Sequence, residues 1–360
     1  MEQHNAVTGS IVIADRRIGP GHRPYVIAEM SGNHNQSLER ALAIVDAAAA
    51  SGADAIKLQT YTAATMTLDT DAPGFVIEDA GSLWAGRQLY DLYDEAHTPW
   101  EWHGPIMERA RSHGMACFST PFDESAVDFL ESLGAPAYKI ASFECTDLPL
   151  IRKVAATGKP MIVSTGMATL AEIDETVRTA IESGCRDLVL LKCTSTYPSS
   201  PENTNLRSIP ALRDAFAQYG VQVGLSDHTM GCGAAVAAVA LGATVVEKHF
   251  TLARADGGVD SAFSLEPAEL AMLRVETERA WQAMGSVRFG ASAPEKKSMI
   301  FRRSLYITQP LQPGDRLGPH NVRTIRPGYG LPPKYLETVM GKRINRTVPA
   351  GTPLAWALLD

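Results

Sequence analysis

The apolar and polar residues of the chain repeat in one phrase: a helix-like segment, a glycine, and a short apolar run typical of a buried strand. Two of the seven phrases are "AAAASGADAIKLQT" and "KVAATGKPMIVST". Each glycine stands where the end of a helix favours a left-handed residue, and a predicted strand follows within a few residues. The seven glycines are Gly52, Gly114, Gly134, Gly158, Gly184, Gly220 and Gly242.

The pattern predicts eight strands, because a further apolar run, "YVIAEMS", precedes the first phrase. A helix is expected after each strand, and Pro267 lies near the first turn of the last one, "EPAELAMLRVETERAWQAM". Alternating strands and helices imply right-handed βαβ units, and eight units in about 260 residues are typical of a TIM (β/α)8 barrel. A doubly wound sheet is the weaker α/β alternative, because no GxGxxG follows the first strand.

Three segments fall outside the predicted barrel. Residues 10–24 are expected to form a short hairpin that plugs the bottom of the barrel, within a domain of residues 1–285. Residues 286–298 contain small and charged residues and are predicted to be a helix-free linker. Residues 299–360 are punctuated by proline and glycine, which indicates a small domain rich in turns and short strands.

Composition and charge narrow the class of protein. Charged residues are 20% and apolar residues 45% of the 360 residues, as in an ordinary globular protein. The net charge of -7 argues against nucleic acid as the main partner. Five cysteines without a CxxC pair favour reduced thiols, and neither a leader-like N-terminus nor a membrane-length apolar run is found. We therefore expect a cytoplasmic protein with no membrane partner.

Polar side chains gather at the predicted strand ends. The active site of a TIM barrel lies where the C-terminal ends of its strands meet, a face called the mouth below. We expect the strand-end groups to converge there. They are Glu29, Ser31, Asn33, His34, Lys57, Gln59, Ser119, Thr120, Lys139, Ser142, Glu144, Ser164, Thr165, Lys192, Ser195, Thr196, Tyr197, Ser226, Asp227, His228, Glu247 and His249.

Two histidines are predicted to lie side by side, because "GLSDH" and "VVEKHF" end neighbouring strands. A lone strand-end histidine is more often a hydrogen-bonded core residue. The pair of His228 and His249 favours a metal site instead, with positions left for water and substrate oxygen. Such a donor set suits Mn²⁺ or Mg²⁺ better than structural zinc.

Lys57 and Lys139 are predicted to form a cationic cluster with the hydroxyls of Ser119, Thr120, Ser142 and Ser164, with no matching run of carboxylates. Lysine binds phosphate as a point charge, so an anion site is one interpretation. Lysines that extend to water at a wet barrel rim are the other.

At these strand ends the sequence resembles the sialic acid synthase family, enzymes that condense phosphoenolpyruvate with an acetamido sugar. The resemblance covers nearly the whole chain, and "IRPGYG" is similar to part of that family's antifreeze-like SAF domain. The other matching stretches are "IAEMSGNHN", "GADAIKLQT", "FSTPF", "AYKIAS", "IVSTGM", "CTSTYP", "GLSDHT" and "EKHFT".

The resemblance implies a role for each matching residue. His228 and His249 would hold a divalent metal, with Mn²⁺ expected and Mg²⁺ or Co²⁺ as alternatives. Glu29 and Asp260 would contact the sugar or the attacking water. Phosphoenolpyruvate would be held by Lys57, Lys139, Ser142, Ser164 and Ser226, and the remaining expected substrate contacts are Asn33, Gln59, Thr120, Ser195 and Tyr197.

Three features bear on the sugar. Ser195 stands where sialic acid synthases have asparagine, and residues 81–103 and 257–267 are similar to pseudaminic acid synthases. These features favour 2,4-diacetamido-2,4,6-trideoxy-L-altrose as the sugar, with N-acetylneuraminate or legionaminate synthesis as the alternative. Helix packing is expected for most aromatic residues of the first segment, although an aromatic loop over the mouth would suit a C6 methyl group. These aromatics are Trp84, Tyr90, Tyr93, Trp100 and Trp102.

Arg326 in "TIRPGYG" is by default a solvated loop cation. By the resemblance, the small domain would cross a dimer and Arg326 would reach the sugar site of the partner barrel, so a domain-swapped homodimer is expected.

Two other classes of protein explain less of the sequence. A metal-dependent hydrolase barrel would need H-x-H on its first strand, and a carbohydrate- or ice-binding protein would leave the polar strand ends unexplained.

Overall fold

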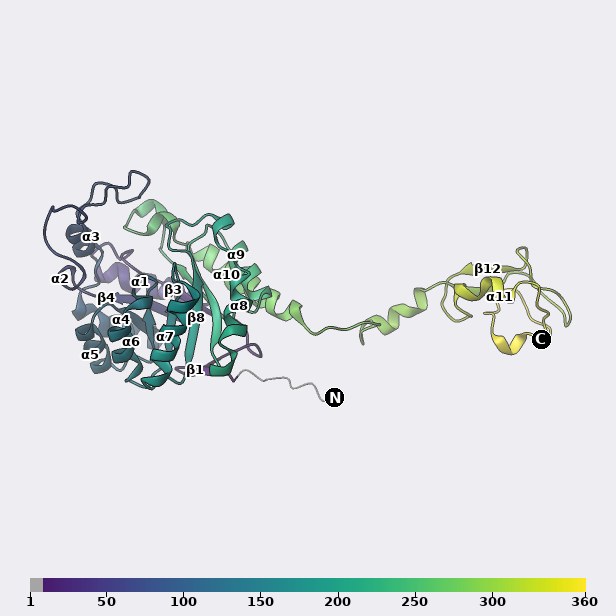
Figure 1. The fold of residues 1–360 in the computed structure, drawn as a ribbon. Coiled ribbons are helices and arrows are strands. Elements are labelled where there is room, and N and C mark those ends of the chain that lie inside the picture. Colours follow the sequence, from purple (N-terminus) through teal and green to yellow (C-terminus); the bar gives the residue numbers. More distant parts are fainter. Residues whose placement is uncertain (1–8) are drawn as a thin grey trace. The chain divides into compact units, whose positions relative to one another are not determined.

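The computed structural model describes residues 9–360, and the chain forms two compact units (Figure 1). The first unit ends at Gly285 and the second comprises Ser286–Asp360. The expectation of an N-terminus without a leader rests mostly on residues 1–8, which lie outside the described range. Within residues 9–360, no helix is both long enough and apolar enough to span a membrane.

The first unit is a closed barrel of eight parallel strands in the order β10-β3-β4-β5-β6-β7-β8-β9. The predicted TIM barrel is therefore confirmed. Its strands are buried on both faces, as expected for a parallel sheet covered by helices. They are β3 (Tyr25–Glu29), β4 (Ala55–Thr60), β5 (Ala116–Pro121), β6 (Tyr138–Ile140), β7 (Met161–Ser164), β8 (Leu188–Cys193), β9 (Gln222–Asp227) and β10 (Val245–His249).

Helices follow every barrel strand and cover its outer face (Figure 1). All seven predicted glycines have positive φ, which confirms their place at the helix ends. Side chains of Ser37, Asp123, Asp147 and Thr169 cap four of the helix starts. The α-helices are α1 (Leu38–Ala50), α2 (Ala63–Met66), α3 (Leu89–Ala96), α4 (Trp100–Ser112), α5 (Glu124–Ser132), α6 (Leu148–Ala155), α7 (Leu170–Glu182), α8 (Ser208–Ala215), α9 (Gly233–Ala240) and α10 (Pro267–Met284). Short 3-10 helices are η1 (Phe143–Thr146), η2 (Pro201–Asn203), η3 (Ala217–Tyr219), η4 (Arg254–Asp256) and η5 (Ser261–Phe263).

The predicted N-terminal hairpin is also present, as β1 (Ile11–Ile13) paired antiparallel with β2 (Arg16–Ile18). Its Ile11, Ile13 and Ile18 pack in one apolar cluster with inward-facing strand residues such as Ile27 and Val245. The hairpin therefore plugs the end of the barrel opposite the mouth.

The second unit has its own apolar core, which includes Leu305, Ile307 and Ile344. The prediction that residues 286–298 are helix-free is wrong, because η6 (Glu295–Phe301) begins within them. Just before it, the backbone N–H of Ser292 donates to the Glu295 carboxylate at 2.8 Å. The other elements are β11 (Ser304–Ile307), β12 (Val322–Ile325), η7 (Pro333–Tyr335), α11 (Leu336–Val339) and η8 (Trp356–Leu358).

Candidate active site at the barrel mouth

The inner face of the barrel changes from apolar to polar over two residues along each strand, toward the C-terminal end. Side chains two residues apart in a strand face the same side, and residues two positions after the inner apolar cluster lie at the mouth. This places both predicted lysines, Thr120 and Ser164 together inside the barrel. The pairs of cluster and mouth residue are Ile27 and Glu29, Ala55 and Lys57, Phe118 and Thr120, Ala137 and Lys139, Ile162 and Ser164, Leu191 and Cys193, and Val245 and Glu247.

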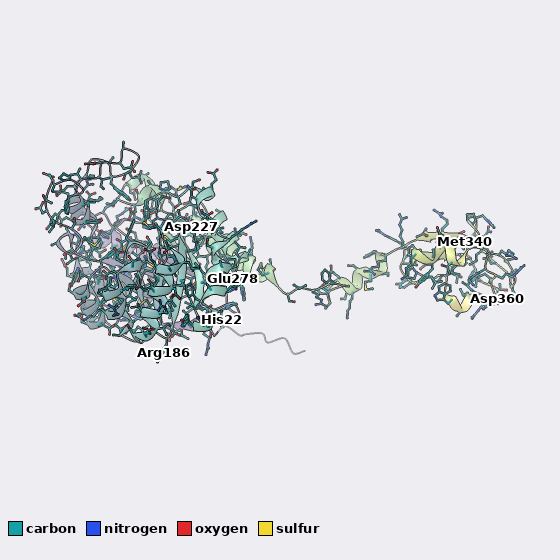
Figure 2. The ribbon with its side chains drawn as sticks, viewed as in Figure 1. His22, Arg186, Asp227, Glu278, Met340 and Asp360 are labelled. Carbon is teal, nitrogen blue, oxygen red and sulfur yellow. The ribbon has the colours of Figure 1, made fainter. Side chains whose placement is uncertain are left out.

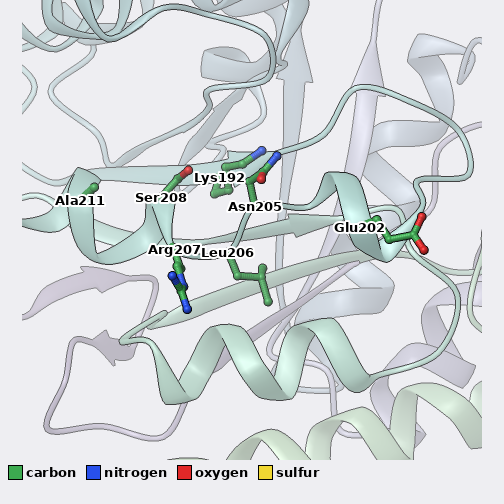
Figure 3. A pocket seen from close by; sticks show the side chains of 7 residues that line it. All are labelled: Lys192, Glu202, Asn205, Leu206, Arg207, Ser208 and Ala211. Carbon is green, nitrogen blue, oxygen red and sulfur yellow. The ribbon is translucent and has the colours of Figure 1, made fainter.

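Three strand-end groups do not reach the mouth, so the expectation that all of them converge is wrong. Ser119 faces outward, and its hydroxyl lies 2.6 Å from that of Thr60. Lys192 also faces outward, into a surface hollow beside α8 (Figure 3). The third is Asp227, labelled in Figure 2, which pairs with Lys248 of the neighbouring strand at 3.0 Å. Each of the three is adjacent in sequence to an inward-facing residue, and successive side chains of a strand point to opposite faces of the sheet.

The two mouth lysines lie in a buried ladder of alternating charge. Lys57 Nζ is 2.8 Å from Glu29 Oε2 and 3.4 Å from Glu247 Oε1, and Lys139 Nζ is 3.5 Å from that same Glu247 oxygen. Ser226 donates to Glu247 Oε1 as well, at 3.0 Å. The prediction of a cationic cluster without matching carboxylates is therefore wrong, since Glu247 bridges the lysines.

Burial sets the ionisation of this ladder. It raises the pKa of Glu29 to about 7, although Lys57 beside it opposes the shift. It also lowers the pKa of Lys139. Burial disfavours the Glu247 carboxylate too, but Lys139 and Lys57 outweigh that effect and lower its pKa. Glu29 is thus a mouth carboxylate poised to exchange a proton near neutral pH.

The predicted histidine pair is formed at the ends of β9 and β10, with ring centroids 5.4 Å apart. Nδ1 of His228 lies 2.9 Å from the carbonyl oxygen of Thr194. If that nitrogen carries the proton and donates, Nε2 is left as a lone-pair donor. Burial lowers the pKa of His228 to about 4, and burial together with His228 lowers that of His249 well below its usual range. Both rings are therefore neutral, the form that binds metals.

The histidine pair fits a divalent cation in a further respect. His249 Nδ1 is buried without a hydrogen-bond partner and lies 3.8 Å from Asp260 Oδ2. An orphaned ring nitrogen of this kind is unfavourable unless something binds it. Within residues 9–360, no group of three or more His, Cys, Asp or Glu side chains has metal-site geometry. A cation here would therefore rest on two imidazoles, with its other ligands from water or substrate.

Other expected site residues surround Glu29. The amide of Gln59 donates to Glu29 Oε1 at 3.0 Å and to the Ser31 hydroxyl at 3.1 Å. Ser31 donates in turn to Asp260, whose pKa burial raises to about 6. Asn33 is fully buried, and its amide nitrogen is taken by the carbonyl oxygen of Phe250 and by Ser264. These two hydrogen bonds hold the loop after β3 in place. The side-chain oxygen of Asn33 is buried without a hydrogen-bond partner.

The hydroxyls near Lys139 lie at the ends of β6, β7 and β8. Ser195 donates to Ser142 Oγ at 2.8 Å. Gly166 permits this approach: it has a positive φ, and a Cβ there would lie 2.5 Å from that of Ser142. Ser164 Oγ is buried without a partner, as an anion-binding group would be before its ligand arrives.

A second mouth carboxylate, besides Glu247, has no role in the sequence-based assignment. Glu144 lies in η1, and its Oε2 is buried without a hydrogen-bond partner. Burial raises its pKa. Its position in the sequence, two residues after Ser142, could have indicated that it lies at the mouth. Arg326 belongs to the second unit, where it is exposed after β12.

The aromatic residues of 81–103 divide between two environments. Trp100 stacks on Phe129 at 4.6 Å, and Trp102 packs edge-on against His34 at 5.6 Å, so both serve helix packing as expected. Trp84 differs, because its ring lies 6.1 Å from that of Tyr197 at the mouth.

Comparisons with known proteins identify the family of this chain. The NeuB family model matches residues 44–289, and the SAF domain model matches residues 302–360. Pseudaminic acid synthase of Campylobacter jejuni is 43% identical over 92% of this chain and 95% of its own length. N,N'-diacetyllegionaminic acid synthase of the same species is 37% identical over 88% of this chain and 94% of its own.

Among solved structures, N-acetylneuraminic acid (sialic acid) synthetase of Leptospira borgpetersenii is similar with a TM-score of 0.72 at 30% identity. The match covers 82% of this chain and 97% of that one. The resemblance drawn from the strand ends is confirmed: the chain belongs to the NeuB family and carries a SAF domain at its C-terminal end.

Proposed function

We propose that this chain is a pseudaminic acid synthase, which condenses phosphoenolpyruvate with 2,4-diacetamido-2,4,6-trideoxy-L-altrose to give pseudaminic acid and phosphate. The observation that carries the proposal is the pairing of two buried lysines with a neutral imidazole pair in one barrel mouth. The higher identity to a pseudaminic acid synthase than to a legionaminic acid synthase supports this sugar.

Phosphoenolpyruvate is an anion at both ends, and the mouth offers matching groups. Lys57 and Lys139 provide two buried cations, and Ser142 and Ser164 provide hydroxyls beside them. A charge pair 4 Å apart attracts by about 4 kcal/mol at an effective dielectric near 20, against about 1 kcal/mol in water. The lysines therefore bind the substrate and fix its orientation.

The sugar reacts as its open-chain aldehyde, and His228 and His249 would hold the divalent cation beside it. That cation, for which Mn²⁺ is our proposal, supplies Lewis acidity toward the aldehyde oxygen. The methylene carbon of phosphoenolpyruvate forms a bond to the aldehyde carbon. The C=O electron pair moves to oxygen, which takes up a proton from solvent water. Asp260, 3.8 Å from His249, would contact the sugar on this side of the mouth.

Bond formation leaves an oxocarbenium at the former enol carbon, to which one water adds. Glu29, with its pKa raised to about 7, orients this water and accepts its proton. The resulting tetrahedral carbon carries a hydroxyl group and the phosphate ester. Its C–O bond to phosphate breaks, the O–H electron pair of the hydroxyl forms the C=O bond of the keto group, and the hydroxyl proton passes to the departing phosphate. Phosphoenolpyruvate, sugar and one water thus give one nonulosonic acid and one phosphate.

The assembly and location are further parts of the proposal. We place the enzyme in the cytoplasm, since all five cysteines are free thiols in the structure. We propose a homodimer in which Arg326 of one chain serves the sugar site of its partner. A planar guanidinium suits this role, because it presents a fixed fork of donors to acetamido and hydroxyl oxygens.

The test is phosphate release from phosphoenolpyruvate with a panel of three sugars and Mn²⁺. The proposal predicts that kcat/KM for the diacetamido-trideoxy-altrose exceeds that for its legionaminate-precursor stereoisomer and that for N-acetylmannosamine by at least tenfold. Comparable values for the altrose and either alternative sugar would overturn it.

A further inference from the structure

A hairpin-shaped loop between α2 and α3 extends from the mouth side of the barrel (Figure 1, dark blue). We call residues 75–89 the lid hairpin. Its two arms are joined by three backbone hydrogen bonds: Leu89 N–H to Phe75 O at 2.9 Å, Ile77 N–H to Arg87 O at 2.9 Å, and Gly86 N–H to Ile77 O at 2.7 Å. The loop therefore has a defined shape and presents its tip residues in fixed positions.

The tip of the lid hairpin is tied to a second loop of the mouth. The indole N–H of Trp84 donates to the carbonyl oxygen of Val259 at 3.1 Å. Val259 follows Gly258, which has a φ of +127°, and a Cβ at that position would lie 2.5 Å from Asn35 Oδ1, so the site favours glycine. The Asn35 amide also donates to the carbonyl of Gly257 at 3.2 Å. Trp84 is thus hydrogen-bonded to a segment, residues 257–259, that Asn35 holds in place.

An apolar wall leads from the imidazole pair to Trp84. Phe263 is buried, with its ring 4.9 Å from that of His249 and 5.4 Å from that of Tyr197. Tyr197 lies 4.4 Å from His228 on one side and 6.1 Å from Trp84 on the other. Three loops, following β4, β8 and β10, therefore build one aromatic surface.

We propose that Trp84 is a specificity-determining residue that contacts the methyl end of a 6-deoxy sugar. This inference rests on the proposed function. The aldehyde end of the sugar reacts beside the imidazoles, so the opposite end extends along the aromatic wall toward Trp84. The indole N–H is already taken by Val259. A hydroxyl on C6 would face aromatic carbon and lose its hydrogen bonds to water, which costs free energy when no partner replaces them.

The test compares two sugars that differ only at C6: the diacetamido-trideoxy-altrose and its 6-hydroxy analogue. Recognition of one small group in an apolar pocket changes kcat/KM by roughly 10–200-fold. We expect Trp84→Ala to lower the ratio of kcat/KM for the 6-deoxy sugar over the 6-hydroxy sugar by at least tenfold. The KM for phosphoenolpyruvate should stay within twofold, because the lysine ladder is untouched.

Two further variants sharpen the result. Leu83→Ala is the matched control, since Leu83 is the neighbouring tip residue and 51% exposed, and it should leave the ratio unchanged. Trp84→Phe keeps an aromatic face without the indole N–H and should retain more of the ratio than Trp84→Ala does.

An unchanged ratio in both Trp84 variants, or an equal loss in Leu83→Ala, would overturn the inference while leaving the proposed function intact. A wild-type enzyme that prefers the 6-hydroxy sugar would contradict both.

Discussion

The ion pair of Asp227 and Lys248 allows the sharpest prediction about stability. Both side chains are 0% exposed and lie 3.0 Å apart on the outer face of β9 and β10, directly behind the two histidines. Lys248 also donates to the carbonyl oxygen of Thr229, whose N–H donates to Asp227 at 2.9 Å. We consider the change Lys248→Met, which keeps an unbranched side chain shorter by the terminal ammonium group and removes its charge.

The expected cost follows from burial. Two unit charges 3.0 Å apart attract by about 5–6 kcal/mol at an effective dielectric near 20. Removal of one partner from a buried pair typically costs about 3–5 kcal/mol, because the other charge stays buried and unpaired. Asp227 keeps the Thr229 N–H, so we expect about 3 kcal/mol, the lower end of that range.

Urea unfolding followed by tryptophan fluorescence measures this change. Four of the five tryptophans, Trp84, Trp100, Trp102 and Trp281, lie before residue 286, so the signal reports mainly on the barrel. Arg178→Met serves as the exposed control. It breaks a pair with Asp174 in which both side chains are about half exposed, and such pairs contribute about 0.3–0.5 kcal/mol.

The double variant Asp227→Asn/Lys248→Met completes the cycle. It leaves no unpaired buried charge behind the histidines, so it should recover most of the loss of the single variant. If Lys248→Met lowers the free energy of unfolding no more than Arg178→Met does, the reasoning about the buried pair is wrong.

Three further predictions concern activity. His228→Ala should abolish turnover while circular dichroism stays native, because it removes a ligand and little core; near-normal turnover after chelation and Mn²⁺ addition would contradict the metal pair. Lys139→Ala should mainly raise the KM for phosphoenolpyruvate and Glu29→Gln should mainly lower kcat. Because Glu29 acts deprotonated, kcat should rise with pH through about 7, and this acid limb should vanish in Glu29→Gln; a persisting limb would assign it to another group. Finally, mixed subunits of His228→Ala and Arg326→Ala chains should recover activity if Arg326 acts in trans, whereas sites built within one chain would stay inactive.

The fold could be predicted from the sequence because its signals are local. The left-handed glycines mark helix ends, and the strand runs that follow are apolar on both faces. The face of each strand residue was also available, from the alternation of side chains. Lys192 and Cys193 are adjacent in sequence, and only Cys193 follows the inward parity of Leu191. The prediction that Lys192 lies at the mouth counted every polar residue at a strand end and did not consider which face of the strand it points to.

The partners within the site were not accessible in the same way. Glu247 meets Lys57 and Lys139 only because the barrel closes, which brings together side chains from strands β10, β4 and β6. Sequence spacing carries no information on that distance. The turn at residues 295–301 differs, because the contact between Ser292 and Glu295 that precedes it joins residues only three positions apart in sequence.

The central claim is that this barrel mouth joins the methylene carbon of phosphoenolpyruvate to a diacetamido sugar and releases phosphate by C–O cleavage at the enol carbon. Phosphoenolpyruvate labelled with oxygen-18 at its bridging enol oxygen, followed by ³¹P NMR, tests it directly. The account predicts that phosphate appears only when the sugar and Mn²⁺ are present, in amounts equal to the nonulosonic acid formed, and that it carries the label. Release of phosphate without the sugar, or retention of the label in the sugar acid, would contradict it.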